Sequence, residues 1–333
     1  MASPNPLLLL PTLGDDLGRV ETQLRRSVQA EDPFLTEVAS HLITAGGKRV
    51  RPAFAITAAA TRSAAMVPAT PEVISGAVSV ELVHLGSLYH DDVMDDAITR
   101  RTVESVNARW GNLKAILAGD YLLARASEIA ASLGTEVAGL LASTIARLCE
   151  GQILELQHTF DVTRSERAYL ASIDGKTAAL LATACRIGGI VADLPRPVID
   201  ELTQFGHRYG MAFQIVDDIL DVVATDEELG KPSGHDLVEG VYTLPVIRVL
   251  AGGGPDADRL GELLGQPLDG ADLDTARAIV AASGQVDAAL DTARAYAAEA
   301  ATSLAKVAGT EAGAALVAAS DHLLETVQAA AAR

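Results

Sequence analysis

Residues 81–101 read ELVHLGSLYHDDVMDDAITRR, and residues 213–222 read FQIVDDILDV. Both stretches contain two adjacent aspartates and a third one turn later, within an apolar, helix-compatible run. On an α-helix, positions i, i+1 and i+4 fall on one side, so each stretch stacks three carboxylates on one face. The first aspartate cluster is Asp91, Asp92 and Asp95, and the second aspartate cluster is Asp217, Asp218 and Asp221.

Three carboxylates on one helix face repel one another, and the repulsion grows where the surroundings are dry. A cation must normally compensate them. Carboxylate oxygens suit Mg²⁺, which uses one or two of them and fills its octahedron with water and substrate phosphate. Two such helices predict a clamp for a diphosphate. A solvated acidic helix face is the alternative; it is plausible for one cluster in a chain of net charge −18, and less so for two.

The composition favours an all-α fold. Hydrophobic residues make up 49% of the chain and aromatic residues only 4%, a bias towards helix formers over strand formers. The breaks between periodic segments are short, so we expect one large helical domain over residues 1–333. The helical segments expected up to the glycine-rich break near residue 253 are 13–30, 33–45, 50–65, 71–96, 113–132, 135–159, 165–190, 196–224 and 241–252.

Charge and cysteine content exclude several classes of protein. With 44 acidic and 26 basic residues, the chain lacks the basic surface that nucleic acids require. We find no uncharged run near the 18–20 residues of a transmembrane helix. Cys149 and Cys185 have no metal-site or disulfide spacing, which is typical of a reduced, cytoplasmic protein. The run Leu7–Leu10 is interpreted as a docking tail.

Several cations could hold phosphate groups. Residues 46–52 read GGKRVRP, in which Lys48 and Arg51 follow a flexible glycine loop. Arg100 and Arg101 come shortly after Asp95, within reach of whatever the first aspartate cluster holds. A surface turn with solvated charges is the alternative for the glycine loop.

Two lysines are also candidates for binding phosphate groups. Lys176, in Gly-Lys-Thr at 175–177, is a candidate phosphate ligand, although Leu170 stands where a nucleotide-binding loop needs glycine. Lys231 follows the second aspartate cluster by ten residues and is a further candidate.

His84 and Gln214 lie on the aspartate faces. His84 precedes Asp91 by two helical turns, and Gln214 precedes Asp217 by three residues. Each could instead be a hydrogen-bonded core residue.

Taken together, these motifs resemble the trans-isoprenyl diphosphate synthases, or polyprenyl synthetases. The match covers about residues 45–245 and includes five motifs in the right order, which are the four quoted above and a fifth that runs from GKPSGHD at 230–236 through TLP at 243–245. The resemblance implies the all-α isoprenoid synthase fold around a central cavity, usually as a homodimer. It also implies Mg²⁺-dependent condensation of an allylic diphosphate with isopentenyl diphosphate, with three Mg²⁺ ions per active site.

The resemblance also assigns roles by position. The six aspartates would hold Mg²⁺ against the allylic diphosphate, which Arg100, Lys176 and Lys231 would also bind. The residues implied for isopentenyl diphosphate are Lys48, Arg51, His84 and Arg101. Thr177 and Gln214 would place oxygen dipoles near the developing allylic cation. Related enzymes often carry lysine where this chain has Val241.

Product length is expected to depend on residues that precede Asp91 on its helix. Ser87, Gly86, Val83 and Val80 carry no aromatic ring, whereas a bulky residue near this point stops elongation early in the family resembled. We therefore expect a long-chain product of C30 or longer.

Other functions remain open at this point. The chain could be a farnesyl or geranylgeranyl diphosphate synthase, or a non-catalytic subunit of a heteromeric prenyl synthase. A class I terpene cyclase also ionises a diphosphate with Mg²⁺, but it would not need the second set of cations at Lys48, Arg51 and Arg101.

Overall fold

A computed structural model describes residues 5–225 and 233–331 of the chain. Almost all of the regular structure is helical. The helices of the first half are η1 (Pro6–Leu9, 3₁₀), α1 (Leu13–Ser27), α2 (Pro33–Thr44), α3 (Val50–Ala60), α4 (Pro71–Met94), α5 (Val106–Trp110), α6 (Asn112–Ser132) and α7 (Thr135–Leu156). Those of the second half are α8 (Glu166–Ile173), a π-turn η2 (Asp174–Ala178), α9 (Ala179–Val191), α10 (Arg196–Val223), α12 (His235–Val238), α13 (Leu244–Gly252), α14 (Pro255–Leu263), α15 (Gly270–Ala282), α16 (Gln285–Thr302) and α17 (Glu311–Ala331).

Local sequence explains where the central helix α4 begins. The Thr70 side chain accepts a hydrogen bond from the Val73 N–H at 3.3 Å, and Pro71 occupies the first turn. Both features are favourable at a helix N-terminus, where the first N–H groups lack helical partners. α4 then runs through the core and ends at the first aspartate cluster. Fourteen residues of this helix are buried, so it is covered on nearly every side.

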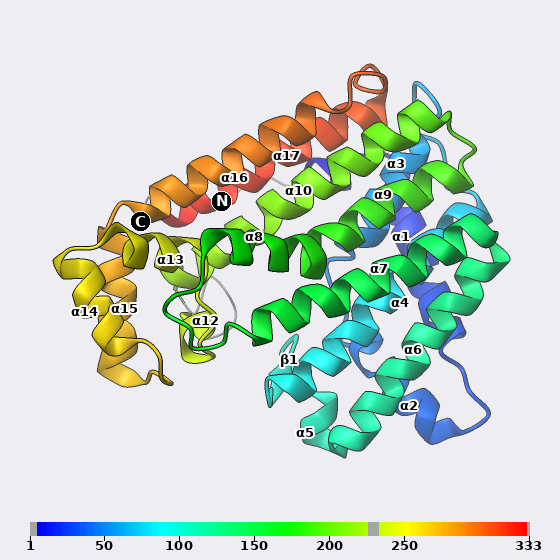
Figure 1. The fold of residues 1–333 in the computed structure, drawn as a ribbon. Coiled ribbons are helices and arrows are strands. Elements are labelled where there is room, and N and C mark those ends of the chain that lie inside the picture. The colour runs from blue at the N-terminus through cyan, green and yellow to red at the C-terminus, as the bar shows by residue number, and fades with distance from the viewer. Residues whose placement is uncertain (1–4, 226–232, 332–333) are drawn as a thin grey trace.

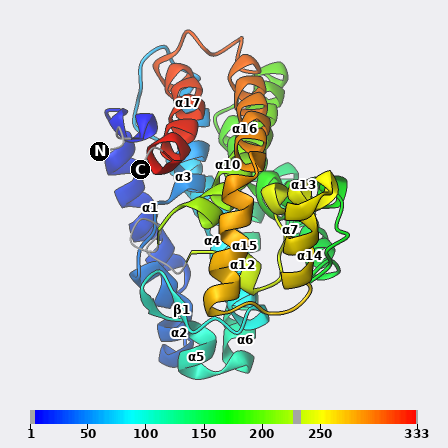
Figure 2. The same ribbon diagram turned by 90° about the vertical axis from the view of Figure 1, so that its left-hand side faces the viewer.

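Two long helices organise the molecule. α4 packs against α3, α6 and α9, and α10 packs against α9, α16 and α17. Figure 1 shows α10 running beneath the antiparallel pair α16 and α17, with α4, α6 and α2 on the opposite side. α14 and α15 lie together at the left-hand edge of Figure 1, which faces the viewer in Figure 2. One continuous apolar core runs from Leu7 to Leu323.

The helices expected from sequence up to residue 252 are confirmed, with ends that differ by a few residues. Two features were not expected. A two-residue strand pair, β1 (Thr99–Arg100) and β2 (Val103–Glu104), closes the turn after α4, and the π-turn interrupts the predicted helix 165–190. The docking interpretation of Leu7–Leu10 fits the contacts of η1 with α17. Of the two cysteines, whose small apolar-like side chains led us to expect both in the core, Cys185 is buried and Cys149 is exposed.

α7 is the one described helix that is long and apolar enough to cross a membrane. Length and composition alone are weak evidence for such a role, because helices of globular cores pass the same test. α7 contacts α6, α8 and α9, and its C-terminal turns line the cleft described below. Only 22% of its most apolar stretch is buried, so α7 also presents apolar surface.

Candidate active site

A cleft of about 310 Å³ opens where the C-terminal ends of α4, α7 and α10 meet. Asp95 comes from the end of α4, Asp218 from α10 and Lys176 from the π-turn. An adjoining groove of about 250 Å³ runs between α4 and α7 and shares Lys176 with the cleft. Asp91 lines this groove. The tertiary structure therefore brings both aspartate clusters to one opening, as the paired motifs predicted.

The first aspartate cluster lies in partly dry surroundings. Asp92 is fully buried, and the Arg100 guanidinium donates to its Oδ1 at 2.6 Å, while its Oδ2 has no protein partner. Burial raises the pKa of Asp91, and the charge of Lys176 opposes the shift. Removal from water, together with the negative charge of Glu239, raises the pKa of Asp95 to about 6. The cluster thus carries more negative charge than the protein compensates.

The second aspartate cluster is held by a chain of hydrogen bonds. The Thr177 hydroxyl donates to Gln214 Oε1 at 2.7 Å, and Gln214 Nε2 donates to Asp218 Oδ1 at 2.7 Å. The Tyr169 hydroxyl donates to the other oxygen, Oδ2, at 2.5 Å. Despite these bonds, burial raises the pKa of Asp218 to about 7. Together these hydrogen bonds fix the orientation of the Asp218 carboxylate.

The other two members of the cluster differ in exposure. Asp221 is buried and accepts a hydrogen bond from the Asp236 N–H at 3.1 Å, whereas Asp217 is exposed. This contact ties the end of α10 to the Gly-His-Asp stretch at 234–236.

Lys176 is the cation that lies between the two aspartate clusters. Its ammonium donates to Glu155 Oε1 at 2.5 Å. Burial disfavours its charge, but Glu155, Asp91 and Asp95 together raise the pKa of Lys176. The lysine therefore stays charged and ready to exchange a carboxylate partner for a phosphate. The other lysine predicted for this group, Lys231, lies outside the described residues.

A second cationic group, which we call the basic cluster, comes from the glycine loop, the start of α3 and the turn between β1 and β2. It consists of Lys48, Arg51 and Arg101. Arg101 donates to the carbonyls of Leu42, at 3.1 Å, and Gly46, so β1 and the glycine loop are joined. Gly47 has φ +155°, and a Cβ there would lie 2.8 Å from the Arg101 guanidinium, which explains the glycine.

The charge of Arg101 affects the pKa of both Arg51 and His84, so the three side chains lie near one another. Burial lowers the pKa of Arg51, which Arg101 lowers further and Glu81 opposes. The Nε of Arg51 is buried without a protein partner. Burial and the neighbouring arginines hold the pKa of His84 well below its usual value, so His84 is a neutral hydrogen-bonding group. Lys48 is exposed to solvent.

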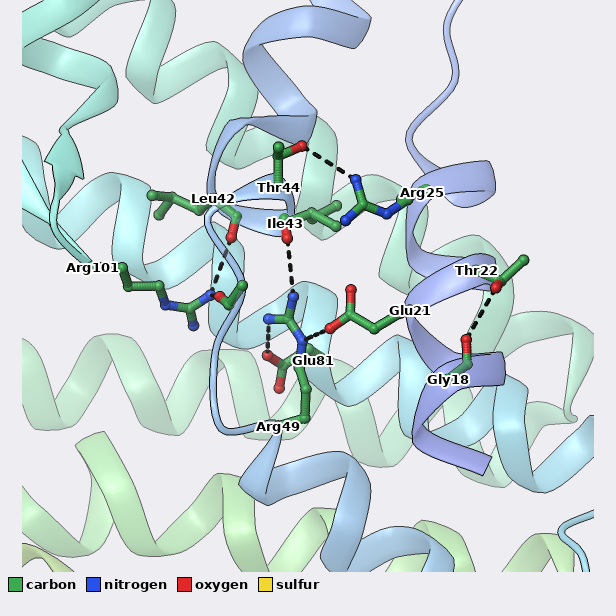
Figure 3. A network of polar contacts seen from close by, with 11 residues as sticks. Gly18, Glu21, Thr22, Arg25, Leu42, Ile43, Thr44, Arg49, Glu81 and Arg101 are labelled. Carbon is green, nitrogen blue, oxygen red and sulfur yellow. Dashed lines mark hydrogen bonds and ion pairs between the residues drawn. The ribbon is translucent and has the colours of Figure 1, made fainter. Parts of the chain in front are cut away.

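The arginine between Lys48 and Arg51 has a structural role. Arg49 points into the protein, where it contacts Glu21 of α1 and Glu81 of α4 and donates to the Ile43 carbonyl at 3.2 Å (Figure 3). The side chains of Arg49 and Glu81 are only 4% and 2% exposed. Burial raises the pKa of Glu81, against the attraction of Arg49 and Arg51. This network fastens the glycine loop to α4.

The aspartates fit a divalent metal without forming a closed cage. Among the described residues, no group of three or more His, Cys, Asp and Glu side chains is arranged to hold an ion. Mg²⁺ does not need such a group, because it takes one or two carboxylates and completes its shell with water and phosphate. The Oδ2 of Asp92, which is buried without a protein partner, fits a ligand atom for such an ion.

The residues expected to set product length lie in different surroundings. Ser87 lines the groove beside Asp91, together with apolar residues of α7. Val80 and Val83 are fully buried in the core, and a Cβ on Gly86 would lie 3.1 Å from the Gly119 carbonyl of α6. A straight shaft down α4 past Val83 is therefore not open here, because side chains fill it. The roles of Val80, Val83 and Gly86 in chain length stay predictions.

Sequence reasoning missed several residues of this site. Glu155 contacts Lys176, and Tyr169 contacts Asp218. Two further residues that line the cleft are Glu239 and Asp236. Tyr169 lies seven residues before Lys176, two helical turns away, which is the same signal that identified His84. No sequence signal separates the buried Arg49 from its neighbours. Val241, the position where relatives often carry lysine, also lines the cleft.

Comparison with known proteins adds an independent finding. Residues 32–281 match the family model described as polyprenyl synthetase. The chain is 41% identical over 305 residues to a nonaprenyl diphosphate synthase of Mycobacterium tuberculosis, covering 90% of each chain. It is 45% identical over 240 residues to heptaprenyl diphosphate synthase component 2 of Geobacillus stearothermophilus, covering 72% of this chain and 74% of that protein.

A solved structure resembles nearly the whole fold. The polyprenyl synthase of Caulobacter crescentus, complexed with calcium and isoprenyl diphosphate, superposes with a TM-score of 0.90 at 32% identity. The match covers 97% of this chain and 98% of that one.

Proposed function

This chain belongs to the polyprenyl synthetase family, and from that premise we propose that it condenses an allylic diphosphate with isopentenyl diphosphate. The product is a trans-polyprenyl diphosphate of C30 or longer, and the activity depends on Mg²⁺. The observation that supports the proposal is the meeting of both aspartate clusters with Lys176 at one cleft. The aspartate clusters with Lys176 would form one anion subsite, and the basic cluster, whose Arg51 feels the charge of Asp91, would form the other.

Two subsites separate this function from its closest alternative. A class I terpene cyclase ionises one diphosphate and has no use for a second anion site. Besides burial, the charges of Arg51 and Arg101 lower the pKa of His84, whereas Arg100, whose charge also reaches His84, pairs with Asp92 of the first aspartate cluster. Arginine binds phosphate oxygens through two parallel hydrogen bonds, so the basic cluster can orient a second diphosphate.

The reaction follows from this placement. The aspartate clusters would hold Mg²⁺, which when bound neutralises charge that develops on the departing diphosphate. Lys176 and Arg100 donate hydrogen bonds to the same diphosphate as its C–O bond breaks. The basic cluster would hold isopentenyl diphosphate so that its double bond forms the new C–C bond with the allylic cation, and the resulting cation then loses a proton to the released diphosphate. Apolar walls keep water from the allylic cation.

Incubation of the purified protein tests this proposal directly. We expect product from isopentenyl diphosphate and an allylic primer when Mg²⁺ is present, and none after chelation by EDTA. Titration of Mg²⁺ at saturating substrate tests the proposed number of three ions. Conversion of an allylic diphosphate alone into a cyclic hydrocarbon would establish the cyclase alternative. Activity that appears only after addition of a second protein would show a heteromeric synthase.

Product length is proposed to depend on Ser87. Its small side chain leaves the groove between α4 and α7 open beside Asp91. A phenylalanine at this position would place a large ring across the path of the growing chain. We therefore expect Ser87→Phe to shorten the product, as seen by chromatography of the dephosphorylated prenols.

Ser87→Ala is the matched control for that variant. It removes only the local hydrogen bond to the His84 carbonyl and should leave the product distribution unchanged. The open-groove argument fails if the unmutated enzyme already stops at a farnesyl or geranylgeranyl product. It also fails if Ser87→Phe makes the same products as the unmutated enzyme.

We further propose that two copies associate through α6 and α7. Leu113 and Leu117 of α6 are 79% and 66% exposed, and Ile153 of α7 is 54% exposed. α6 and α7 pack against each other, and large exposed apolar side chains on neighbouring helices are typical of an interface. We expect a dimer in light scattering, and we expect Leu117→Glu to dissociate it, because it places a charge in an apolar contact. A monomeric unmutated protein would contradict this proposal.

A cytoplasmic location is proposed on the chemistry of the cysteines. Both are free thiols in the structure, and free thiols persist in reducing compartments. Cell fractionation with compartment markers would test this.

A further inference from the structure

The π-turn Asp174–Ala178 carries two residues of the site, Lys176 and Thr177. Across this turn the Ala179 N–H donates to the Asp174 carbonyl, five residues back, instead of four as in an α-helix. Such turns are rare, and they need surrounding structure to hold the extra residue in place. The shape of this turn decides where the Lys176 ammonium and the Thr177 hydroxyl enter the cleft.

Backbone contacts hold the turn on two sides. A Cβ on Gly151 of α7 would lie 2.4 Å from the Lys176 nitrogen, and a Cβ on Gly210 of α10 would lie 2.6 Å from the Ala178 Cα. Both distances are shorter than real Cβ contacts, so α7 and α10 touch the turn backbone to backbone. These contacts limit movement towards either helix, but they do not prevent the turn from sliding along them.

Asp174 supplies the missing restraint. Its Oδ2 accepts a hydrogen bond from Arg147 of α7 at 2.6 Å, and its Oδ1 pairs with His207 of α10. The hydrogen bond with His207 is the largest of the contacts that lower the pKa of Asp174, so the carboxylate is charged. One side chain at the first position of the π-turn therefore bridges the two helices between which the turn lies.

We propose that Asp174 is a positioning residue for the condensation reaction, acting through Lys176 and Thr177. It does not line the cleft. Its bridge to Arg147 and His207 fixes the π-turn, and the turn presents the ammonium to the allylic diphosphate and the hydroxyl to Gln214. This inference rests on the proposed function, because Lys176 has this task only if the cleft binds an allylic diphosphate.

Steady-state kinetics of Asp174→Ala test the idea. We expect the KM for the allylic primer to rise and kcat to fall, each by about 10-fold, as for outer-shell partners of functional groups. The KM for isopentenyl diphosphate should change by less than about twofold, because the basic cluster is untouched. Asp174→Asn keeps one acceptor oxygen and should recover part of the loss. Arg147→Met, which removes one arm of the bridge, should shift the same two constants in the same direction.

The chain offers a matched control on the same two helices. Arg196 of α10 pairs with Glu136 of α7, far from the π-turn. Glu136→Ala also removes an ion pair between α7 and α10, so it reports the cost of loosening the helices. We expect it to leave both KM values unchanged.

A double-mutant cycle with Lys176→Ala distinguishes a positioning role of Asp174 from a general effect of its loss on the structure. If Asp174 acts through the turn, Asp174→Ala should cost less in the Lys176→Ala background than alone, because only Thr177 then remains to be positioned. Fully additive losses, equal effects on both KM values, or an unchanged Asp174→Ala enzyme would each overturn the inference. Full activity of Lys176→Ala alone would instead contradict the proposed allylic site, so the two failures can be told apart.

Discussion

Replacement of Asp91 or Asp217 by alanine is expected to abolish turnover while the protein stays folded. Each change removes a carboxylate that would hold Mg²⁺ against the departing diphosphate. The groups that stabilise developing charge are often worth 10²–10³-fold each in kcat, and we expect a loss of about 1000-fold or about 4 kcal/mol here. Stability should hold or improve, because the mutation also relieves repulsion between crowded carboxylates.

The measurement is kcat at saturating Mg²⁺ and substrates, with thermal unfolding of the same samples. Asp200→Ala is a suitable control, because Asp200 lies on α10 as Asp217 does but pairs with Arg186 at the surface. It should retain full activity. Unchanged kcat in Asp91→Ala, or an enzyme that works equally well in EDTA, would remove the metal clamp from the mechanism.

Arg49→Met is expected to have the largest effect on stability. Methionine keeps the length of the side chain and makes no new demand on the backbone, which already has φ +46°. It leaves Glu81 buried without its 2.9 Å partner. Loss of one member of a buried ion pair typically costs about 3–5 kcal/mol, a large share of the ~5–15 kcal/mol that stabilises a typical protein. Urea denaturation should show this as a lower midpoint.

A second variant shows whether the cost comes from the stranded charge. In Arg49→Met/Glu81→Leu both partners are apolar, and such replacements are often close to neutral. We expect the double variant to regain at least half of the lost stability. A double variant less stable than Arg49→Met would mean that the fold depends on Glu81 for another reason, such as its attraction to Arg51.

The identity of the subsites was predictable because their signals are local. Helix periodicity places Asp91, Asp92 and Asp95 on one face wherever α4 lies in the fold, and the same holds for the second aspartate cluster. Glycine followed by paired cations likewise predicts a phosphate loop from neighbouring residues alone. The helical segments up to residue 252 were predictable for the same reason, since capping and apolar periodicity act within a few turns.

Contacts between distant segments carry no such signal. Arg49 and Arg51 are two residues apart in one motif, yet Arg49 forms a buried ion pair with Glu81, whereas the Nε of Arg51 is buried without a protein partner. Only the packing of α1, α4 and the glycine loop separates their roles. The π-turn at Asp174 arises in the same way, because α7 and α10 approach it from segments far apart in the sequence.

The predicted path of the growing product shows the same difference between local and tertiary signals. Sequence determined that Ser87 stands one turn before Asp91 without a bulky ring, because helix geometry fixes that spacing. It could not determine that Val83 and Val80, further along α4, are covered by neighbouring helices. The sequence by itself thus determined the chemistry of the groups and their order along each helix. Only the tertiary structure decided which of them face the cleft, because burial depends on what the other helices place against each face.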